Sequence, residues 1–84
     1  MTKETIDKFI ELCHKAYEAD TDLSFQLLTA EARGFSNAIQ LAFGLNAWGD
    51  MVMQTDLSFD KNVLVCAGVP LFRKELQPVE NERD

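Results

Sequence analysis

The clearest hydrophobic pattern lies near the start of the chain. Apolar side chains recur there at intervals of three and four residues, which is the spacing of one face of an α-helix. They are Ile6, Phe9, Ile10, Cys13 and Tyr17. Thr2 is expected to cap this helix, because its hydroxyl can accept a hydrogen bond from a free amide of the first turn. The helix is expected to end near Asp20, where Asp20-Thr21-Asp22 is typical of a polar turn.

A second apolar stripe with the same period follows this turn. Its members are Phe25, Leu28, Ala32, Phe35, Ile39 and Ala42. The stripe predicts one long helix from about Leu23 to Phe43, with Thr21 or Asp22 as its cap. The alternative is two helices, the first ending at Gly34 and the second capped by Ser36, since a glycine costs up to about 1 kcal/mol inside a helix. In both cases the short connection predicts an antiparallel helical hairpin.

The pattern weakens after Gly44, which is expected to cap the end of the long helix. A short helix over residues 46–52 is expected next, capped by its asparagine. Another is expected over residues 58–67, capped by its serine and ended by Gly68 and Pro70.

A β-hairpin is the alternative for this region, with Met51–Thr55 paired to Val63–Ala67. The density of valine at 63–65 favours strands. Helices are preferred, because the two segments do not alternate apolar and polar residues and the loop between them would be long.

These elements together predict an all-α fold, a compact bundle of four or five helices that starts with the antiparallel hairpin. An α+β fold with a small C-terminal β-hairpin is the alternative. A chain of 84 residues has room for one domain. We expect that domain to cover residues 1–76, and residues 77–84 to form a flexible acidic tail.

The charge of the chain limits its partners. Fourteen acidic residues against eight basic ones give a net charge of −6, and no basic stripe is present. Direct binding to nucleic-acid phosphates or to an anionic membrane surface is therefore disfavoured. An acidic surface attracts a basic protein instead.

Cellular location is expected to be cytoplasmic. Glu4, Asp7 and Glu11 stand where a secretory signal would be apolar, and no apolar run is long enough for a membrane span. Cys13 and Cys66 lie among apolar neighbours and outside any CxxC pair, which predicts two buried, reduced thiols.

Catalytic and cofactor chemistry has little support in the sequence. His14 is the single histidine, and it points about 100° away from Cys13 on the same helix, so the two cannot act as base and nucleophile. Glu18, Asp20 and Asp22 alternate as in a calcium loop, but the glycine and the distal glutamate of such a loop are absent. We therefore expect no enzyme activity, no metal and no cofactor.

Two charge-free segments, Gly34–Gly49 and Asn62–Phe72, are the most informative feature for function. Both fit the core of the domain, but a chain this small cannot bury every side of them. Part of an apolar patch around Trp48 is therefore expected to stay exposed and to contact another protein. The candidate residues are Phe43, Leu45, Trp48, Met51 and Met53, together with the acidic turn Glu18, Asp20 and Asp22, which would steer the partner.

The function expected from these features is that of a small acidic, non-enzymatic protein-binding module, an adaptor or an inhibitor. One alternative is an inhibitor that mimics nucleic acid and blocks a basic groove, of the kind that phages and other mobile elements encode. The other alternative is a helical homodimer, paired through the patch or through the stripe of the second helix.

Overall fold

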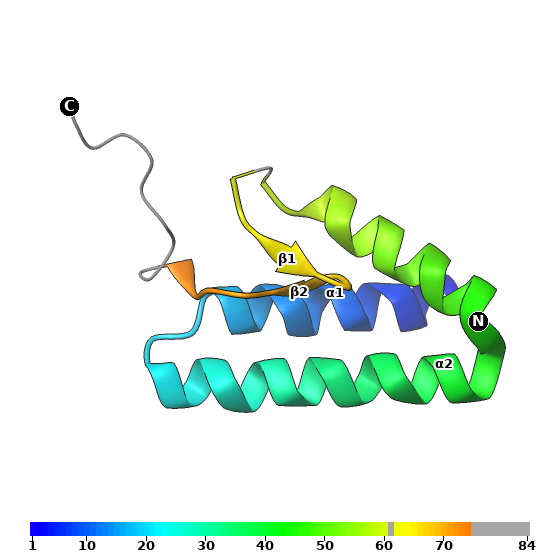
Figure 1. Cartoon of the computed structure of the whole chain (residues 1–84), viewed down its shortest axis with the longest axis horizontal. Helices are drawn as coiled ribbons and strands as arrows, with labels where there is room; N and C mark the ends of the chain where they lie inside the picture. Colours follow the sequence, from blue (N-terminus) through cyan, green and yellow to red (C-terminus); the bar gives the residue numbers. More distant parts are fainter. Residues whose placement is uncertain (61, 75–84) are drawn as a thin grey trace.

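The computed structural model describes residues 1–60 and 62–74. In that part of the chain, two helices are followed by a small antiparallel hairpin: α1 (Lys3–Tyr17), α2 (Asp22–Ser58), β1 (Val65–Cys66) and β2 (Val69–Pro70) (Figure 1). The predicted bundle of four or five helices is therefore wrong. The alternative, an α+β fold with a C-terminal β-hairpin, fits the structure.

Helix α1 begins as predicted, because the Thr2 hydroxyl accepts a hydrogen bond of 3.3 Å from the Thr5 amide. Its buried face consists of Phe9, Leu12, Cys13 and Ala16. The predicted stripe is thus rotated slightly, with Ile6, Ile10 and Tyr17 only half-buried. None of the helices described has the length and hydrophobicity that a membrane crossing requires.

Helix α2 begins at a cap formed by Thr21, whose hydroxyl accepts from the Ser24 amide at 3.1 Å. It continues through Gly34 without a break, so the one-helix prediction for this stretch is confirmed. The first part of α2 lies antiparallel to α1, as the hairpin prediction requires (Figure 1). It turns Thr29, Ala32, Ser36 and Ile39 inward.

At Gly44 the axis of α2 changes direction. The backbone there has φ 92° and ψ 172°, a conformation that is open to glycine and strained for other residues. The helix resumes at once, and residues 45–58 run back over α1 (Figure 1). The sequence therefore located this break correctly, but the second segment extends beyond the predicted residues 46–52.

Among residues 59–60 and 62–74, no further helix of the predicted kind forms. Phe59 is extended, with φ −99° and ψ 151°, and the predicted helix over 58–67 is wrong. The chain reaches Val65 and Cys66, turns at Ala67 and Gly68, and pairs Val65 with Pro70 and Cys66 with Val69.

The predicted partner of this strand is also corrected. Met51–Thr55 is helical, because Met51 and Thr55 lie one turn apart on the buried face of α2 and the Thr55 hydroxyl donates to the Met51 carbonyl at 2.8 Å. The strand pairs instead with the segment directly after it. A hairpin between neighbouring segments needs only a short turn, which Gly68 supplies with φ 81°.

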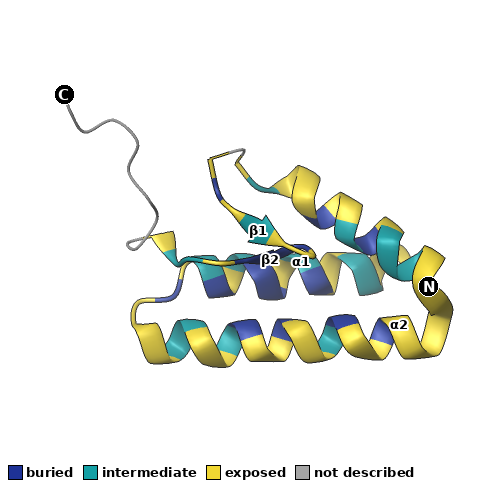
Figure 2. Ribbon diagram, in the orientation of Figure 1, coloured by how far each residue is buried: buried dark blue, intermediate teal, exposed yellow. Residues whose placement is uncertain are grey.

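The core lies between the two parts of α2, α1 and the hairpin (Figure 2). Phe9 is at its centre and stacks on Phe35, with ring centroids 5.8 Å apart. The other buried members are Leu12, Cys13, Ala32, Ile39, Met51 and Val69. The predicted acidic tail, residues 77–84, lies outside the described residues.

Candidate interaction surface and cavity

The residues of the predicted apolar patch separate into three environments. Phe43, Leu45 and Met53 are 51%, 63% and 63% exposed. Met51 is completely buried in the core, and Trp48 is half-buried. Leu57, one helical turn after Met53, is 79% exposed and was not among the predicted residues. We call Phe43, Leu45, Met53 and Leu57 the bend surface, since they lie at the Gly44 bend and on the helical segment after it.

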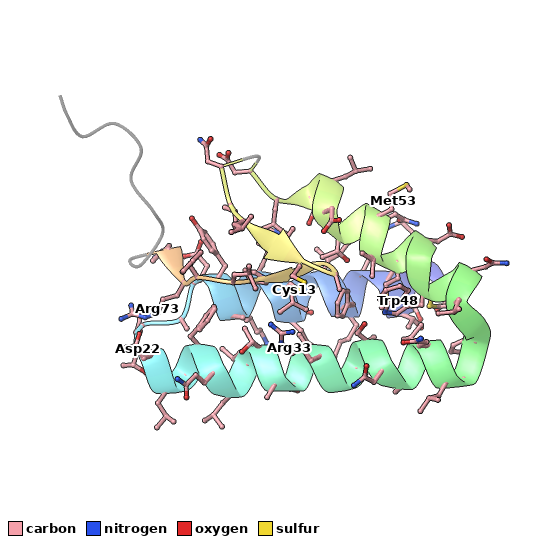
Figure 3. All side chains as sticks on the ribbon, viewed as in Figure 1. Cys13, Asp22, Arg33, Trp48, Met53 and Arg73 are labelled. Atoms are coloured by element: carbon pink, nitrogen blue, oxygen red, sulfur yellow. The ribbon has the colours of Figure 1, made fainter. Side chains whose placement is uncertain are left out.

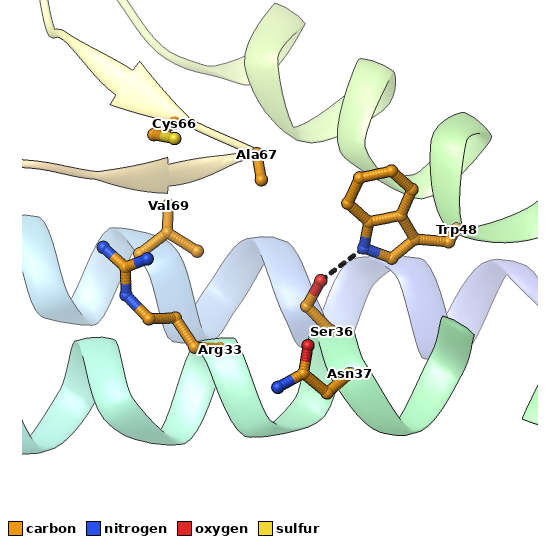
Figure 4. A pocket seen from close by; sticks show the side chains of 7 residues that line it. All are labelled: Arg33, Ser36, Asn37, Trp48, Cys66, Ala67 and Val69. Atoms are coloured by element: carbon orange, nitrogen blue, oxygen red, sulfur yellow. Dashed lines mark hydrogen bonds between the residues drawn. The ribbon is translucent and has the colours of Figure 1, made fainter. Parts of the chain in front are cut away.

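Trp48 connects the two parts of α2 across the bend. Its indole Nε1–H donates a hydrogen bond to the hydroxyl of Ser36, which is buried (Figure 4). The ring also packs against the core. Trp48 therefore helps to hold the bent shape of α2, a role that the sequence does not reveal.

The segment that carries most of the bend surface holds charges of one sign in its sequence. Residues 34–60 contain Asp50, Asp56 and Asp60 and no lysine or arginine. Partial desolvation raises the pKa of the Asp56 carboxyl above its usual value. A nearby cation would relieve this cost, because it favours the charged form of the carboxyl.

The acidic turn that the sequence singled out is paired with the chain itself. Glu18 accepts a hydrogen bond of 2.8 Å from Lys74, and Asp22 accepts one of 2.9 Å from Arg73. Asp20 is exposed. The turn lies at the opposite end of the helical hairpin from the Gly44 bend, so the structure does not bring the predicted turn and patch together (Figure 3).

The outer side of α2 carries a second group of exposed apolar residues that the sequence reading did not select. Leu23, Leu27 and Leu41 are 66%, 63% and 88% exposed. Ala30 and Gly34 are exposed between them, at helical spacings of three and four residues. We call these five residues the outer stripe of α2. They lie opposite the buried face that contains Ala32 and Ile39 (Figure 2).

A cavity of about 200 Å³ opens between α2 and the hairpin (Figure 4). It is lined by Arg33, Ser36 and Asn37 from the first part of α2, by Trp48 from the second part, and by Cys66, Ala67 and Val69 from the hairpin. No sequence motif predicts this cavity, because its walls come from three segments that meet only in the folded protein. One signal was available: Arg33 has no acidic residue three or four positions away.

The two cysteines and the histidine are in different surroundings. Cys13 is buried, and burial together with the charge of Asp56 raises the pKa of its thiol to about 12. Cys66 is exposed, which corrects the expectation that both thiols are buried. The His14 ring stacks on Phe59 with centroids 4.3 Å apart, and its Nε2 lies 3.3 Å from the Ser58 hydroxyl oxygen. The contacts of His14 with Phe59 and Ser58 therefore connect α1 to the C-terminal end of α2.

Comparison with models of known protein families, with curated proteins and with solved structures found no match. We therefore infer a function from the geometry of this chain. That geometry provides two sets of exposed apolar residues on α2, with Asp50 and Asp56 on the segment that carries one of them, and a small cavity with an arginine in its wall.

Proposed function

We propose that this chain is a non-enzymatic protein-binding module, an adaptor or inhibitor, that docks its partner on the bend surface. One observation carries the proposal: Phe43, Leu45, Met53 and Leu57 are between 51% and 79% exposed. Full burial of an exposed side chain of this kind is favourable by about 1.5–3 kcal/mol, and more than half of each of these four is exposed. All four lie within residues 43–57, and exposed apolar residues that form a patch commonly mark a contact with another protein.

The partner that fits this surface is a basic amphipathic segment. The bend surface is flanked by Asp50 and Asp56, and no cation lies within residues 34–60. A partner with lysines or arginines beside apolar side chains would bury the apolar residues and meet the carboxylates at once. Met53 suits such a role, because its unbranched side chain adapts to the shape of the opposing surface.

The test is a comparison of two double variants. Met53→Ser with Leu57→Ser removes exposed apolar area from the bend surface, and Leu23→Ser with Leu27→Ser removes a similar area from the outer stripe. We expect a partner captured by the wild type from its host to bind the first variant at least about tenfold more weakly, and the second variant unchanged. Pull-down followed by calorimetry with the purified partner measures both.

Salt provides a second measurement on the same complex. Binding should weaken as ionic strength rises, since exposed charges are screened over about 10 Å at 0.1 M salt. Equal affinity of the wild type and the bend-surface variant would refute the proposal. Competition by DNA would instead favour the nucleic-acid-mimic alternative, which stays a prediction.

The outer stripe supports a second candidate function, self-association through α2. Suppose that two α2 helices pair antiparallel through this stripe and cross at the level of residue 32 along the axis. Leu23 of one copy then faces Leu41 of the other, and Ala30 faces Gly34. Large residues then meet at the ends of the contact and small ones at its centre, where the helices can approach closely. The stripe itself contains no charged residue.

Sedimentation over a range of concentrations tests the homodimer. We expect the wild type to form a dimer that Leu27→Glu converts to a monomer, since a buried carboxylate without a partner is costly. Leu57→Glu, at the bend surface, is the matched control and should leave the dimer intact. A wild-type chain that stays monomeric at the highest concentration rules this candidate out.

A further inference from the structure

We propose that the cavity between α2 and the hairpin binds a small organic carboxylate, with Arg33 pairing its charge and Trp48 packing against its apolar part. This site is separate from the bend surface, and its ligand class does not depend on the identity of a protein partner. The cavity, its residues and the Trp48–Ser36 hydrogen bond are drawn in Figure 4.

Arg33 lines the cavity, and its charge is not paired within the part of the chain that the structure describes. Four of the five other lysines and arginines in the described residues pair with a carboxylate, namely Lys3, Lys15, Arg73 and Lys74. Lys8, on the exposed side of α1, forms no ion pair there but does not line this cavity. Arg33 forms no ion pair within residues 1–60 and 62–74, although acids outnumber bases by fourteen to eight. Positions 29, 30, 36 and 37, its neighbours on the helix surface, hold Thr, Ala, Ser and Asn.

The polar groups beside Arg33 are neutral. The Ser36 hydroxyl accepts from the Trp48 indole, so its own hydrogen can be donated to a ligand oxygen. Asn37 adds a side-chain amide, which also has two N–H donors. No aspartate or glutamate of the described chain lines the cavity. A guanidinium with neutral donors around it matches a carboxylate, which it can bind with two parallel hydrogen bonds.

The size of the cavity limits the ligand. Its volume of about 200 Å³ is small beside the roughly 300–1,000 Å³ of sites for drug-sized molecules. A single ring or a short chain fits, and a nucleotide does not. The net charge of −6 also disfavours anions that carry several charges. Trp48, Ala67 and Val69 supply an apolar wall for the remainder of a monocarboxylic acid.

Trp48 is the single tryptophan of the chain, so its fluorescence reports on this cavity directly. We expect titration with sodium benzoate at constant ionic strength to change the emission saturably, with a dissociation constant on the order of 1 mM. Benzamide, an uncharged molecule of the same shape, should bind at least about tenfold more weakly, because it lacks the charge that Arg33 pairs.

Two variants test the role of Arg33. Arg33→Gln should weaken benzoate binding at least about tenfold, whereas Lys8→Gln, which removes an equal charge from the exposed side of α1, should leave it unchanged. Asn37→Asp keeps Arg33 and adds a carboxylate to the cavity wall, so it should abolish benzoate binding even if Arg33→Gln does not fold. The proposal is overturned by the absence of a saturable change, by equal binding of benzamide, or by unchanged benzoate binding in a folded Arg33→Gln or Asn37→Asp variant.

Discussion

Single residues decide how reactive the two thiols are. Cys13 has no exposed surface, and burial is the main reason that the pKa of its thiol rises to about 12. A thiol with a raised pKa stays protonated at neutral pH, and the protonated form is a poor nucleophile. Cys66 is on the exposed edge of the hairpin and has no such protection.

Alkylation with iodoacetamide at pH 8 should therefore distinguish the two cysteines. We expect intact-mass measurement to show a single adduct, at Cys66, in the folded protein. Modification of Cys13 should be at least roughly tenfold slower and should become fast in denaturant, since unfolding exposes the thiol and returns its pKa to the ordinary range. Cys66→Ser serves as the control, because it leaves Cys13 as the reporter. Rapid modification of native Cys13 would contradict the buried placement.

Another residue-scale requirement lies at the tip of the hairpin. A Cβ atom at Gly68 would stand 3.1 Å from the Cε2 atom of Phe9 and 3.2 Å from the Cβ atom of Thr55. The residue also has φ 81°. Gly68 therefore combines a left-handed turn with a close approach to the core, and both require the absence of a side chain.

At the scale of the element, α2 depends on the different conformations of its glycines. Gly34 is helical and open, with no atom within 4 Å of the position its Cβ would take. Gly44 has equally open surroundings but φ 92° and ψ 172°, where a side chain strains the backbone. The same substitution should therefore have opposite effects at these two positions.

We expect Gly34→Ala to raise the free energy of unfolding by about 0.5–1 kcal/mol, since alanine favours the helix and restricts the unfolded chain. Gly44→Ala should lower it by about 1–3 kcal/mol. Urea denaturation followed by circular dichroism at 222 nm measures both, and each variant is the control for the other. A Gly44→Ala protein as stable as the wild type would mean that α2 does not need the bend.

The β-hairpin shows why local propensity did not predict the last described element. Residues 58–67 contain a plausible cap and apolar residues at helical spacing, yet Phe59 is extended and Val65–Cys66 forms a strand. Phe59 stacks on His14 and meets the edge of Tyr17, and Val69 is buried in the core. These contacts join residues far apart in sequence, and together with Gly68 they favour the hairpin over another helix.

At the scale of the whole molecule, the two ends have different electrostatic roles. At the connection between α1 and α2, Arg73 and Lys74 neutralise Asp22 and Glu18. At the Gly44 bend, Asp50 and Asp56 have no lysine or arginine within residues 34–60. The carboxylates of Glu18 and Asp22, which the sequence suggested as part of a steering site, therefore form ion pairs within the chain. We propose the other end, at the Gly44 bend, as the docking surface.

The exposure of the apolar candidate residues agrees with the prediction in part. The length of the two charge-free segments predicted that apolar residues near Trp48 stay exposed. Phe43, Leu45 and Met53 are exposed in the structure. Met51 is two residues from Met53 but points to the core, because neighbouring helix positions face different directions. Leu23, Leu27 and Leu41 were not predicted as candidates, because they lie outside the apolar stripe that indicated the helix. The cavity could not be predicted, because the hairpin forms one of its walls.

The sequence by itself determined the features that depend on neighbours within a few residues. These are helix α1 with its Thr2 cap, the first part of α2 with a cap at Thr21 or Asp22, the antiparallel connection and the break at Gly44. Only the tertiary structure decided the path of residues 62–74, the burial of Met51, the ion pair of Arg73 with Asp22 and the cavity at Arg33. Helix periods and caps are short-range interactions that a pattern records directly. The other features depend on contacts between distant segments, which form only when the core of this small domain closes.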